Sequence, residues 1–554
     1  MRHTQRKLAC AGALLAWAMC VGTVLAAHAD GDKVYAEAEA LRIGWPQLAG
    51  PFSTFASAQV ATPLVDDLSK ARKLWESECR DLGRAKGGSQ AYRRVDQFTA
   101  DAMARMGSHP GSWAGLIAAD GMVFCASWRP AGEWVNVQGN KVRLDAEDLV
   151  VALDALTGKT RWLTAEPGGI LKGGGKRQGF QVGPVYRNGA VYSLGSTARL
   201  FAHDAATGRK RWESDVHPAR AAQKKAREDA LAALGSGKFS YALTPNWCAS
   251  LAMAGDVLIV PDQGGGVIGV DSATGKLKWS LRGVLSRWAT PSVWRPEGRE
   301  YVLVANEKGE LRLIDPVPGK ELWKLSGLGP NWFTLAPGRT HVLVNVAADS
   351  GKAPDAERKF GRLGAIKLSP TGAEKAWTVG QGNVIPVWMD SGARIRVPYQ
   401  NGRFLIPHGA SEEGDAGDEP ARPAAAGPAP AAANEPAGRP PTGPAMLIEE
   451  ATGKVLASLP ASGGRNGNLA GLIYWMGHRI ISRGDSYHGP RHGGRHPWSY
   501  WTSADDKLAP LPGKMDLGEF TNAYEVAMEA PLVAGLVFER TEAGTVVCYD
   551  LRAK

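Results

Sequence analysis

The sequence lacks the cysteine patterns of common metal, redox and haem proteins. Its six cysteines form no CxxC, CxxCH or adjacent pair, which excludes zinc-ribbon, thioredoxin-like and c-type haem proteins. It also has no basic run of five or more residues, so the net charge of +10 permits a nucleic-acid partner without predicting one. No G-x-S-x-G motif marks a hydrolase nucleophile. Spacing leaves open the disulfide state of Cys79, Cys125, Cys248 and Cys548.

The N-terminus has the pattern of an export signal. A start with three positive charges (residues 1–7) precedes an apolar stretch (8–27) and a small-x-small site ending at Ala29. We expect a signal peptide over 1–29, a periplasmic or secreted protein, and no transmembrane segment after its removal. An uncleaved anchor is the alternative, because the apolar stretch could span a bilayer. The residues before Cys20 lack a lipobox, so a lipoprotein is not expected.

A repeat runs through the rest of the chain, which is rich in glycine (68) and tryptophan (19). Each copy has an alternating apolar strand, an acid, a Thr-Gly turn and a strand with Trp. The acid starts the turn, the glycine supplies positive φ, and the Trp packs between neighbouring sheets while its N–H seeks a backbone acceptor. Regular spacing argues against a Trp ligand cage. The structural repeat residues are Asp154, Gly158, Trp162, Asp204, Gly208, Trp212, Asp271, Gly275, Trp279, Asp315, Gly319 and Trp323.

These strands predict an all-β fold, a single propeller over residues 43–554. When the weaker copies of the Trp-bearing strand are also counted, down to a degenerate copy at 507–511, the chain has eight blades. Seven blades are the alternative if residues 466–511 do not form a full blade. The Trp75 strand has no partner before it, and the strand at 544–551 has none after it. We therefore expect the N- and C-terminal strands to share one blade and close the ring.

Three insertions interrupt the repeat. Residues 80–110 are a polar insertion, and residues 217–236 are a predicted helix. Its basic part is interpreted as a solvated face, with partner docking as the alternative. Residues 411–444 are rich in Pro and Ala and are expected to form a disordered loop within one blade.

One histidine-rich segment is a weak metal candidate. His488, His492 and His496 could bind Zn²⁺ or Cu²⁺. The glycines and prolines among them exclude a helix that would align the three rings. A solvated loop at a blade tip is therefore the favoured interpretation.

The D-x-x-T-G-x-x-x-W copies and the opening IGWPQLAGP (43–51) resemble PQQ-like (pyrroloquinoline quinone repeat) propellers. That superfamily includes the outer-membrane barrel-assembly scaffolds and the quinoprotein alcohol dehydrogenases. The dehydrogenases usually have a vicinal cysteine disulfide over the quinone, which this chain lacks. The resemblance therefore implies a non-catalytic protein-binding platform or scaffold of the cell envelope. The alternative is a PQQ-dependent alcohol or sugar dehydrogenase.

The expected ligands and partners follow from this interpretation. No cofactor is predicted, and PQQ with calcium belongs only to the dehydrogenase alternative. The expected partner is another envelope protein, the expected oligomeric state is a monomer, and no nucleic acid is expected to bind.

Overall fold

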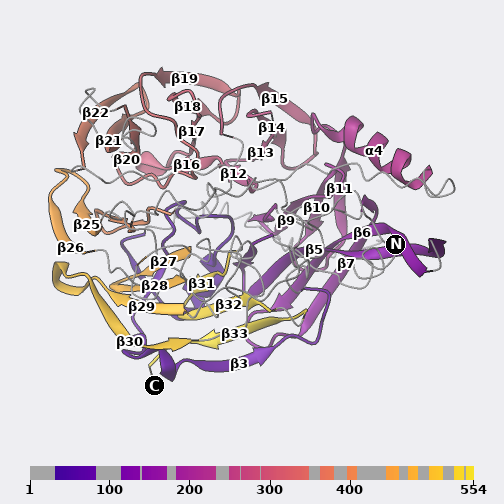
Figure 1. Cartoon of the computed structure of the whole chain (residues 1–554), viewed down its shortest axis with the longest axis horizontal. Helices are drawn as coiled ribbons and strands as arrows, with labels where there is room; N and C mark the ends of the chain where they lie inside the picture. Colours follow the sequence, from indigo (N-terminus) through magenta and orange to yellow (C-terminus); the bar gives the residue numbers. More distant parts are fainter. Residues whose placement is uncertain are drawn as a thin grey trace, which may run out of the picture.

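The described strands form a ring of eight sheets (Figure 1). The computed structural model describes residues 31–82, 114–137, 140–170, 182–232, 249–262, 264–286, 289–347, 362–379, 396–408, 444–460, 469, 472–483, 498–515, 529–541 and 544–553. Within these residues, seven sheets of the ring have four strands and one has three. The eight-bladed all-β propeller is therefore confirmed. The seven-bladed alternative is wrong, because β27 to β30 form a full blade.

We number the sheets from 1 to 8 in chain order, and in each the first strand lies innermost. Sheet 1 contains β4 (Leu116–Ala119), β5 (Met122–Val137), β6 (Asn140–Asp154) and β7 (Thr160–Ile170). Sheet 2 contains β8 (Val185–Arg187), β9 (Ala190–Leu194), β10 (Leu200–Asp204) and β11 (Lys210–Ser214). Sheet 3 contains β12 (Ala252–Ala254), β13 (Val257–Pro261), β14 (Val267–Asp271) and β15 (Leu277–Leu281). Sheet 4 contains β16 (Ser292–Trp294), β17 (Tyr301–Ala305), β18 (Leu311–Asp315) and β19 (Lys320–Leu325).

The second half of the ring repeats this order. Sheet 5 contains β20 (His341–Val346), β21 (Arg362–Ser369) and β22 (Gly372–Thr378), and Pro337 adds a bridge to Val342 at its inner edge. Sheet 6 contains β23 (Tyr399–Gln400), β24 (Arg403–Ile406), β25 (Ala445–Glu449) and β26 (Val455–Leu459). Sheet 7 contains β27 (Leu472–Met476), β28 (Arg479–Arg483), β29 (Trp498–Thr502) and β30 (Ala509–Met515).

Sheet 8 closes the ring with strands from both ends of the chain. It contains β31 (Leu532–Val533), β32 (Leu536–Arg540), β33 (Val546–Asp550) and the N-terminal β3 (Arg72–Glu76). β3 runs antiparallel to β33, with Arg72 opposite Asp550 and Glu76 opposite Val547. The predicted closure by N- and C-terminal strands is therefore confirmed.

Among the described residues, few elements lie outside the eight sheets. They are the pair β1 (Val34–Tyr35) and β2 (Gln59–Val60), the helices α1 (Glu37–Ile43) and α4 (Arg220–Ala232), and the short 3-10 turns η1 (Leu68–Lys70), η3 (Pro296–Gly298) and η5 (Ala504–Asp506). In the described part of the chain, no helix is long and apolar enough to cross a membrane.

Tryptophans join neighbouring sheets through one recurring contact. The indole N–H in the outer strand of one sheet donates to a backbone carbonyl in the last turn of the next, at 2.8 to 3.0 Å. The donor and acceptor pairs are Trp75–Ala155, Trp162–Ala205, Trp212–Ser272, Trp279–Pro316, Trp323–Ser369 and Trp377–Glu450. The indole ring of the Trp also covers the glycine of that turn: a Cβ on Gly158 (φ +70°) would lie 2.4 Å from the Trp75 indole. Glycine is therefore needed there for both conformation and space.

The two faces of the ring carry different connections. The turns after the first and third strands of a sheet lie together, as the Ala155 N–H bond to the Gly121 carbonyl shows in sheet 1. We call this the turn face. The remaining connections, within and between sheets, leave the strands at the opposite face, which we call the connection face. α4 lies in the connection between sheets 2 and 3, which leaves β11 at this face.

Several predicted segments cannot be placed. The signal peptide 1–29, residues 83–110 of the polar insertion, residues 233–236 of the predicted helix and residues 411–443 of the Pro/Ala-rich segment lie outside the described residues. So do His488, His492, His496 and Cys248. The strand ends that flank the long internal undescribed segments all belong to the connection face.

Candidate functional site

The N-terminal segment 43–60 lies across the turn-face end of the ring, where Figure 1 shows the indigo chain inside the circle of sheets. It contacts every sheet. The contacts, from sheet 1 to sheet 8, are Trp45 with Ala118, Pro46 with Tyr186, Gln47 with Met253, Ser53 with Arg295, Ala49 and Phe55 with Ala336, Thr54 with Tyr399, and Ser57 with Trp475 and Leu532. We call this segment the plug.

The plug pairs with the free edges of the innermost strands. Trp45 exchanges two backbone hydrogen bonds with Ala118 of β4, at 2.5 and 3.0 Å. Tyr186 N–H donates to the Pro46 carbonyl at 2.8 Å, and Ser57 N–H donates to the Trp475 carbonyl at 2.8 Å. Backbone groups that would otherwise be unpaired at this end of the ring thus find partners. The plug therefore joins the inner strands at the turn-face end of the ring.

The plug holds an unfavourable backbone conformation. Ala49, Ser53 and Phe55 have φ values of 66°, 60° and 56°, a region that side-chain-bearing residues rarely adopt. Such strain persists only where packing enforces it. Phe55 is 1% exposed, and its ring lies 4.9 Å from the Arg396 guanidinium. The strain therefore places an aromatic ring beneath a buried charge.

A belt of hydroxyl groups lines the channel on sheets 2 to 5, just before the inner strands. Gly183 N–H donates to the Ser250 hydroxyl at 3.1 Å, Ser250 N–H to the Thr290 hydroxyl at 2.8 Å, and Thr290 N–H to the Thr334 hydroxyl at 3.0 Å. Each hydroxyl thereby accepts a hydrogen bond from the preceding sheet. These hydrogen bonds join neighbouring sheets near their inner strands. They also provide partners for polar groups that would otherwise be unpaired.

An ion pair occupies the corresponding positions on sheets 6 and 8. Arg396 Nη2 lies 2.5 Å from Glu529 Oε2, and both side chains are at most 1% exposed. The guanidinium also stacks on the Tyr474 ring at 4.7 Å, and the Tyr474 hydroxyl accepts from Ala530 N–H at 2.7 Å. Burial raises the pKa of Glu529, and the charge of Arg396 opposes that rise. The plug residue Trp45 and these side chains are all buried.

A calcium-bound quinone would require several oxygen ligands in the channel. Calcium takes about six to eight oxygen ligands, whereas the Glu529 carboxylate is already paired with Arg396. Across the described ranges, no three His, Cys, Asp or Glu side chains lie close enough together to hold a metal ion.

The repeat acids lie at the turn face and not in the channel. Asp154 Oδ1 accepts from the backbone N–H groups of Leu156 and Thr157 at 3.1 and 2.9 Å, and its Oδ2 pairs with Arg161 at 2.7 Å. Asp204 and Asp271 make the same bonds to the threonine of their own turns. Their role is to shape turns.

Cys79, Cys125 and Cys548 are free thiols.

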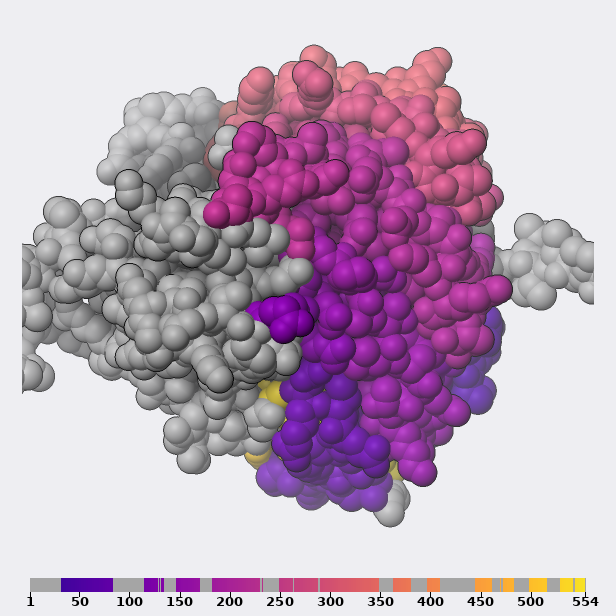
Figure 2. Space-filling view, turned by 90° about the vertical axis from the view of Figure 1, so that its right-hand side faces the viewer, coloured from indigo at the N-terminus to yellow at the C-terminus, as the bar shows by residue number. Residues whose placement is uncertain are grey.

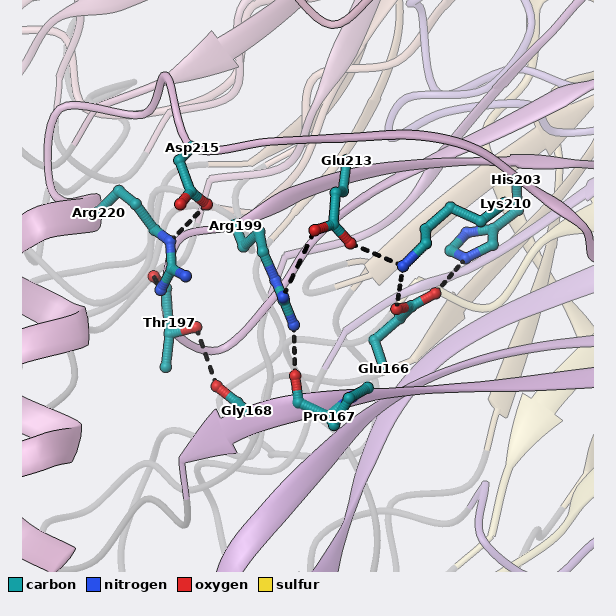
Figure 3. Close-up of polar contacts among 10 residues, drawn as sticks. All are labelled: Glu166, Pro167, Gly168, Thr197, Arg199, His203, Lys210, Glu213, Asp215 and Arg220. Atoms are coloured by element: carbon teal, nitrogen blue, oxygen red, sulfur yellow. Dashed lines mark hydrogen bonds and ion pairs between the residues drawn. The ribbon is translucent and has the colours of Figure 1, made fainter.

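A second polar cluster lies between sheets 1 and 2 (Figure 3). Glu166 on β7 bonds His203 Nε2 at 3.0 Å and Lys210 Nζ at 2.9 Å. Burial raises the pKa of Glu166, but His203 and Lys210 outweigh burial and lower it to about 2. Lys210 also reaches Glu213 at 2.6 Å. The cluster therefore ties the outer strand of sheet 1 to sheet 2.

Asp148 lies beside this cluster, directly opposite Glu166 on the neighbouring strand β6. It is 4% exposed, and its Oδ2 accepts from Ser196 N–H at 3.0 Å. Burial raises its pKa to about 6. Adjacent carboxyl groups with opposite shifts are common at functional sites. Sequence reasoning missed both acids because neither belongs to the repeat motif.

Comparison with known proteins agrees with the repeat. A sequence profile of the PQQ_2 family, described as "Outer membrane protein assembly factor BamB", matches residues 126–333. No curated protein matches the sequence significantly. BamB from Moraxella catarrhalis is 11% identical, with 73% of this chain and 91% of that chain covered and a TM-score of 0.41.

Two quinohemoprotein alcohol dehydrogenases also align with the structure. The enzyme from Comamonas testosteroni is 13% identical over 96% of this chain and 84% of that chain, with a TM-score of 0.44. ADHIIG from Pseudomonas putida HK5 is 13% identical over 95% of this chain and 83% of that chain, with a TM-score of 0.46. The profile match over residues 126–333, the Asp–Thr-Gly–Trp repeats and the closed ring of eight sheets show a β-propeller built from PQQ-like repeats.

Proposed function

We propose that this propeller is a non-catalytic protein-binding platform of the cell envelope, and that its connection face is the docking surface. One observation carries the proposal: the plug lies across the turn-face end of the ring and contacts all eight sheets. The connection face, in contrast, bears α4 and the long hairpin of β5 and β6. Loops on a rigid scaffold commonly carry binding function.

The envelope location rests on the export signal expected at 1–29. The printed name of the matching family, an outer membrane protein assembly factor, supports the same location by analogy. Fractionation of cells that express the full chain tests it: we expect a shortened protein in the periplasmic or secreted fraction. A full-length protein in the cytosol would contradict it.

A PQQ-dependent alcohol or sugar dehydrogenase is the second candidate, since the superfamily contains such enzymes. The paired and buried state of Glu529 and Arg396 weighs against it. We therefore propose that the protein works without PQQ or calcium.

Site-specific photocrosslinking in the full chain tests the docking face. A photoreactive residue replaces Lys224 on α4 or Lys308 in the β17–β18 turn, both exposed at the connection face. Matched controls replace Lys159 and Lys276, which are exposed in turn-face hairpins. We expect a discrete crosslinked protein partner from the connection-face positions only. Crosslinks from the turn face alone would overturn the assignment.

A further inference from the structure

The outer strand of each sheet pairs with another described strand along one edge only, because it lies at the outer end of its sheet. A free edge can pair with a strand of another chain, and proteins commonly protect such edges with charged residues, above all lysine, or with proline. Seven of the eight described outer strands carry a lysine or arginine. These residues are Lys73 on β3, Arg161 on β7, Lys210 on β11, Lys278 on β15, Lys324 on β19, Lys375 on β22 and Lys514 on β30.

The outer strand of sheet 6, β26, is the exception among these eight. Its sequence, VLASL, has neither a charged residue nor a proline. Val455 is 46% exposed, and Ser458 is also exposed. Leu456, Ala457 and Leu459 are partly buried against the apolar cluster between sheets 6 and 7. β26 therefore presents an uncharged edge on a packed, apolar base.

The edge lies on the rim of the ring. Figure 1 shows β26 at the outside of the circle of sheets, on the side opposite α4. Figure 2 views the side that carries α4, over sheets 1 and 2, whose outer strands are charged.

β26 is held in place at both ends. Trp377 of sheet 5 covers the turn before it: a Cβ on Gly453 would lie 2.6 Å from the indole, and the indole N–H donates to the Glu450 carbonyl at 3.0 Å. At the other end, His408 Nε2–H donates to the Leu459 carbonyl at 3.1 Å. Between these ends the strand is paired with β25 along its inner edge. A strand already fixed in its extended shape loses little entropy when a further strand pairs with it.

We propose that the outer edge of β26 binds an extended, uncharged segment of another protein, which adds a fifth strand to sheet 6. Main-chain hydrogen bonds supply the affinity in this mode of recognition. An uncharged segment suits this edge, because a charged side chain would lose water beside the apolar side chains of β26 without gaining a partner. The inference goes beyond docking at the connection face and does not depend on it.

A second copy of the chain is a poorer occupant of this edge. The uncharged edge that it can offer is the same short strand of five residues. Two such strands would bury far less than the roughly 1,200 Å² of a stable interface. A segment of another protein can continue past both ends of β26 and so bury more surface.

Hydrogen exchange of the full chain, with and without a short capped peptide of alternating threonine and valine, tests the edge. We expect the peptide to slow exchange of the β26 amides and to leave exchange of the β15 amides unchanged. Ser458→Lys should abolish this protection, because the lysine places a charge on the edge.

Ser280→Lys on β15 is the matched control. Ser280 and Ser458 are both exposed and lie at the same distance from the turn glycines Gly275 and Gly453. The Ser280→Lys variant should bind the peptide as wild type does, since β15 already carries Lys278 and is not the proposed site.

Three outcomes would overturn the proposal: no protection of β26, equal protection of β15, or wild-type protection in Ser458→Lys. If Ser458→Lys does not fold, a peptide with proline in place of its central valine provides the second test. Proline has no N–H to pair with an edge, so this peptide should not protect β26, and undiminished protection would contradict strand addition.

Sedimentation of the chain without peptide separates the two occupants. We expect a monomer. A dimer that Ser458→Lys dissociates would show that β26 pairs with a second copy, and would overturn the assignment to a segment of another protein.

Discussion

Replacing Trp75 tests how the ring closes. Trp75 is 8% exposed, donates its indole N–H to the Ala155 carbonyl at 3.0 Å, and lies 5.9 Å from the Phe538 ring. Truncating a buried Trp to Ala typically costs about 3–5 kcal/mol. We expect Trp75→Ala to lose about that much unfolding free energy, because β3 would keep its ladder to β33 but lose its contact with sheet 1.

Two matched variants separate the parts of this effect. Trp75→Phe keeps an aromatic ring but leaves the Ala155 carbonyl without its donor, so about 1–2 kcal/mol should be lost. Trp162→Ala removes the equivalent contact between sheets 1 and 2, which the chain already connects. Only Trp75→Ala should therefore expose the β3 strand to proteolysis under native conditions.

Urea titration of the full chain, followed by circular dichroism, measures these losses, and limited proteolysis with mass spectrometry locates the first cleavage. A loss below about 1 kcal/mol for Trp75→Ala would refute the reasoning, since it would mean that the buried indole does not hold the ring closed. So would first cleavage outside β3.

Two further predictions concern the turns and the buried charges. Gly275→Ala and Gly255→Ala both place a side chain at positive φ (71° and 57°), but only Gly275 faces a ring, with a Cβ 2.7 Å from Trp212. Urea titration should show that Gly255→Ala loses about 1–2 kcal/mol of unfolding free energy and that Gly275→Ala loses about 1–3 kcal/mol more. Equal losses in the two variants would contradict the packing role of Gly275. Glu300 is buried and pairs with Arg295 and Arg187. Burial raises the pKa of Glu300, but the two arginines outweigh burial and lower that pKa from 4.5 to about 2. The stabilisation of the folded state by ionised Glu300 is therefore fully present above pH 4.5 and is lost as the pH falls towards 2. Glu300→Gln should lower the unfolding free energy by up to about 3 kcal/mol at pH 7. A loss that does not change with pH would be inconsistent with this prediction.

Local repetition explains how much of the fold the sequence predicts. Each copy of the repeat contains its own strand, turn acid, glycine and Trp, so the blades can be counted from neighbouring residues. Ring closure followed from the same logic, because the Trp75 strand and the 544–551 strand are two halves of one copy. Even the weak strand predicted at 507–511 is part of a full blade, which ends with β30.

The plug and the buried charges could not be predicted in this way. The plug contacts eight sheets through residues far apart in the chain, and its segment has neither repeat nor periodicity. The left-handed conformation of Phe55 is imposed by tertiary packing and contradicts its local preference. Asp148 and Glu166 become neighbours only through strand register, and Arg396 meets Glu529 across 133 residues of chain.

Titration with PQQ and Ca²⁺ tests the central claim, a propeller that binds protein and performs no quinone chemistry. The purified protein is mixed with PQQ and Ca²⁺ in a calorimeter and assayed for dye-linked oxidation of alcohols and aldoses, with a quinoprotein alcohol dehydrogenase apoenzyme as positive control. We predict no saturable heat and no cofactor-dependent turnover, because the buried carboxylate of Glu529 is already paired with Arg396. Saturable 1:1 binding together with turnover would contradict the platform and assign the protein to the dehydrogenases.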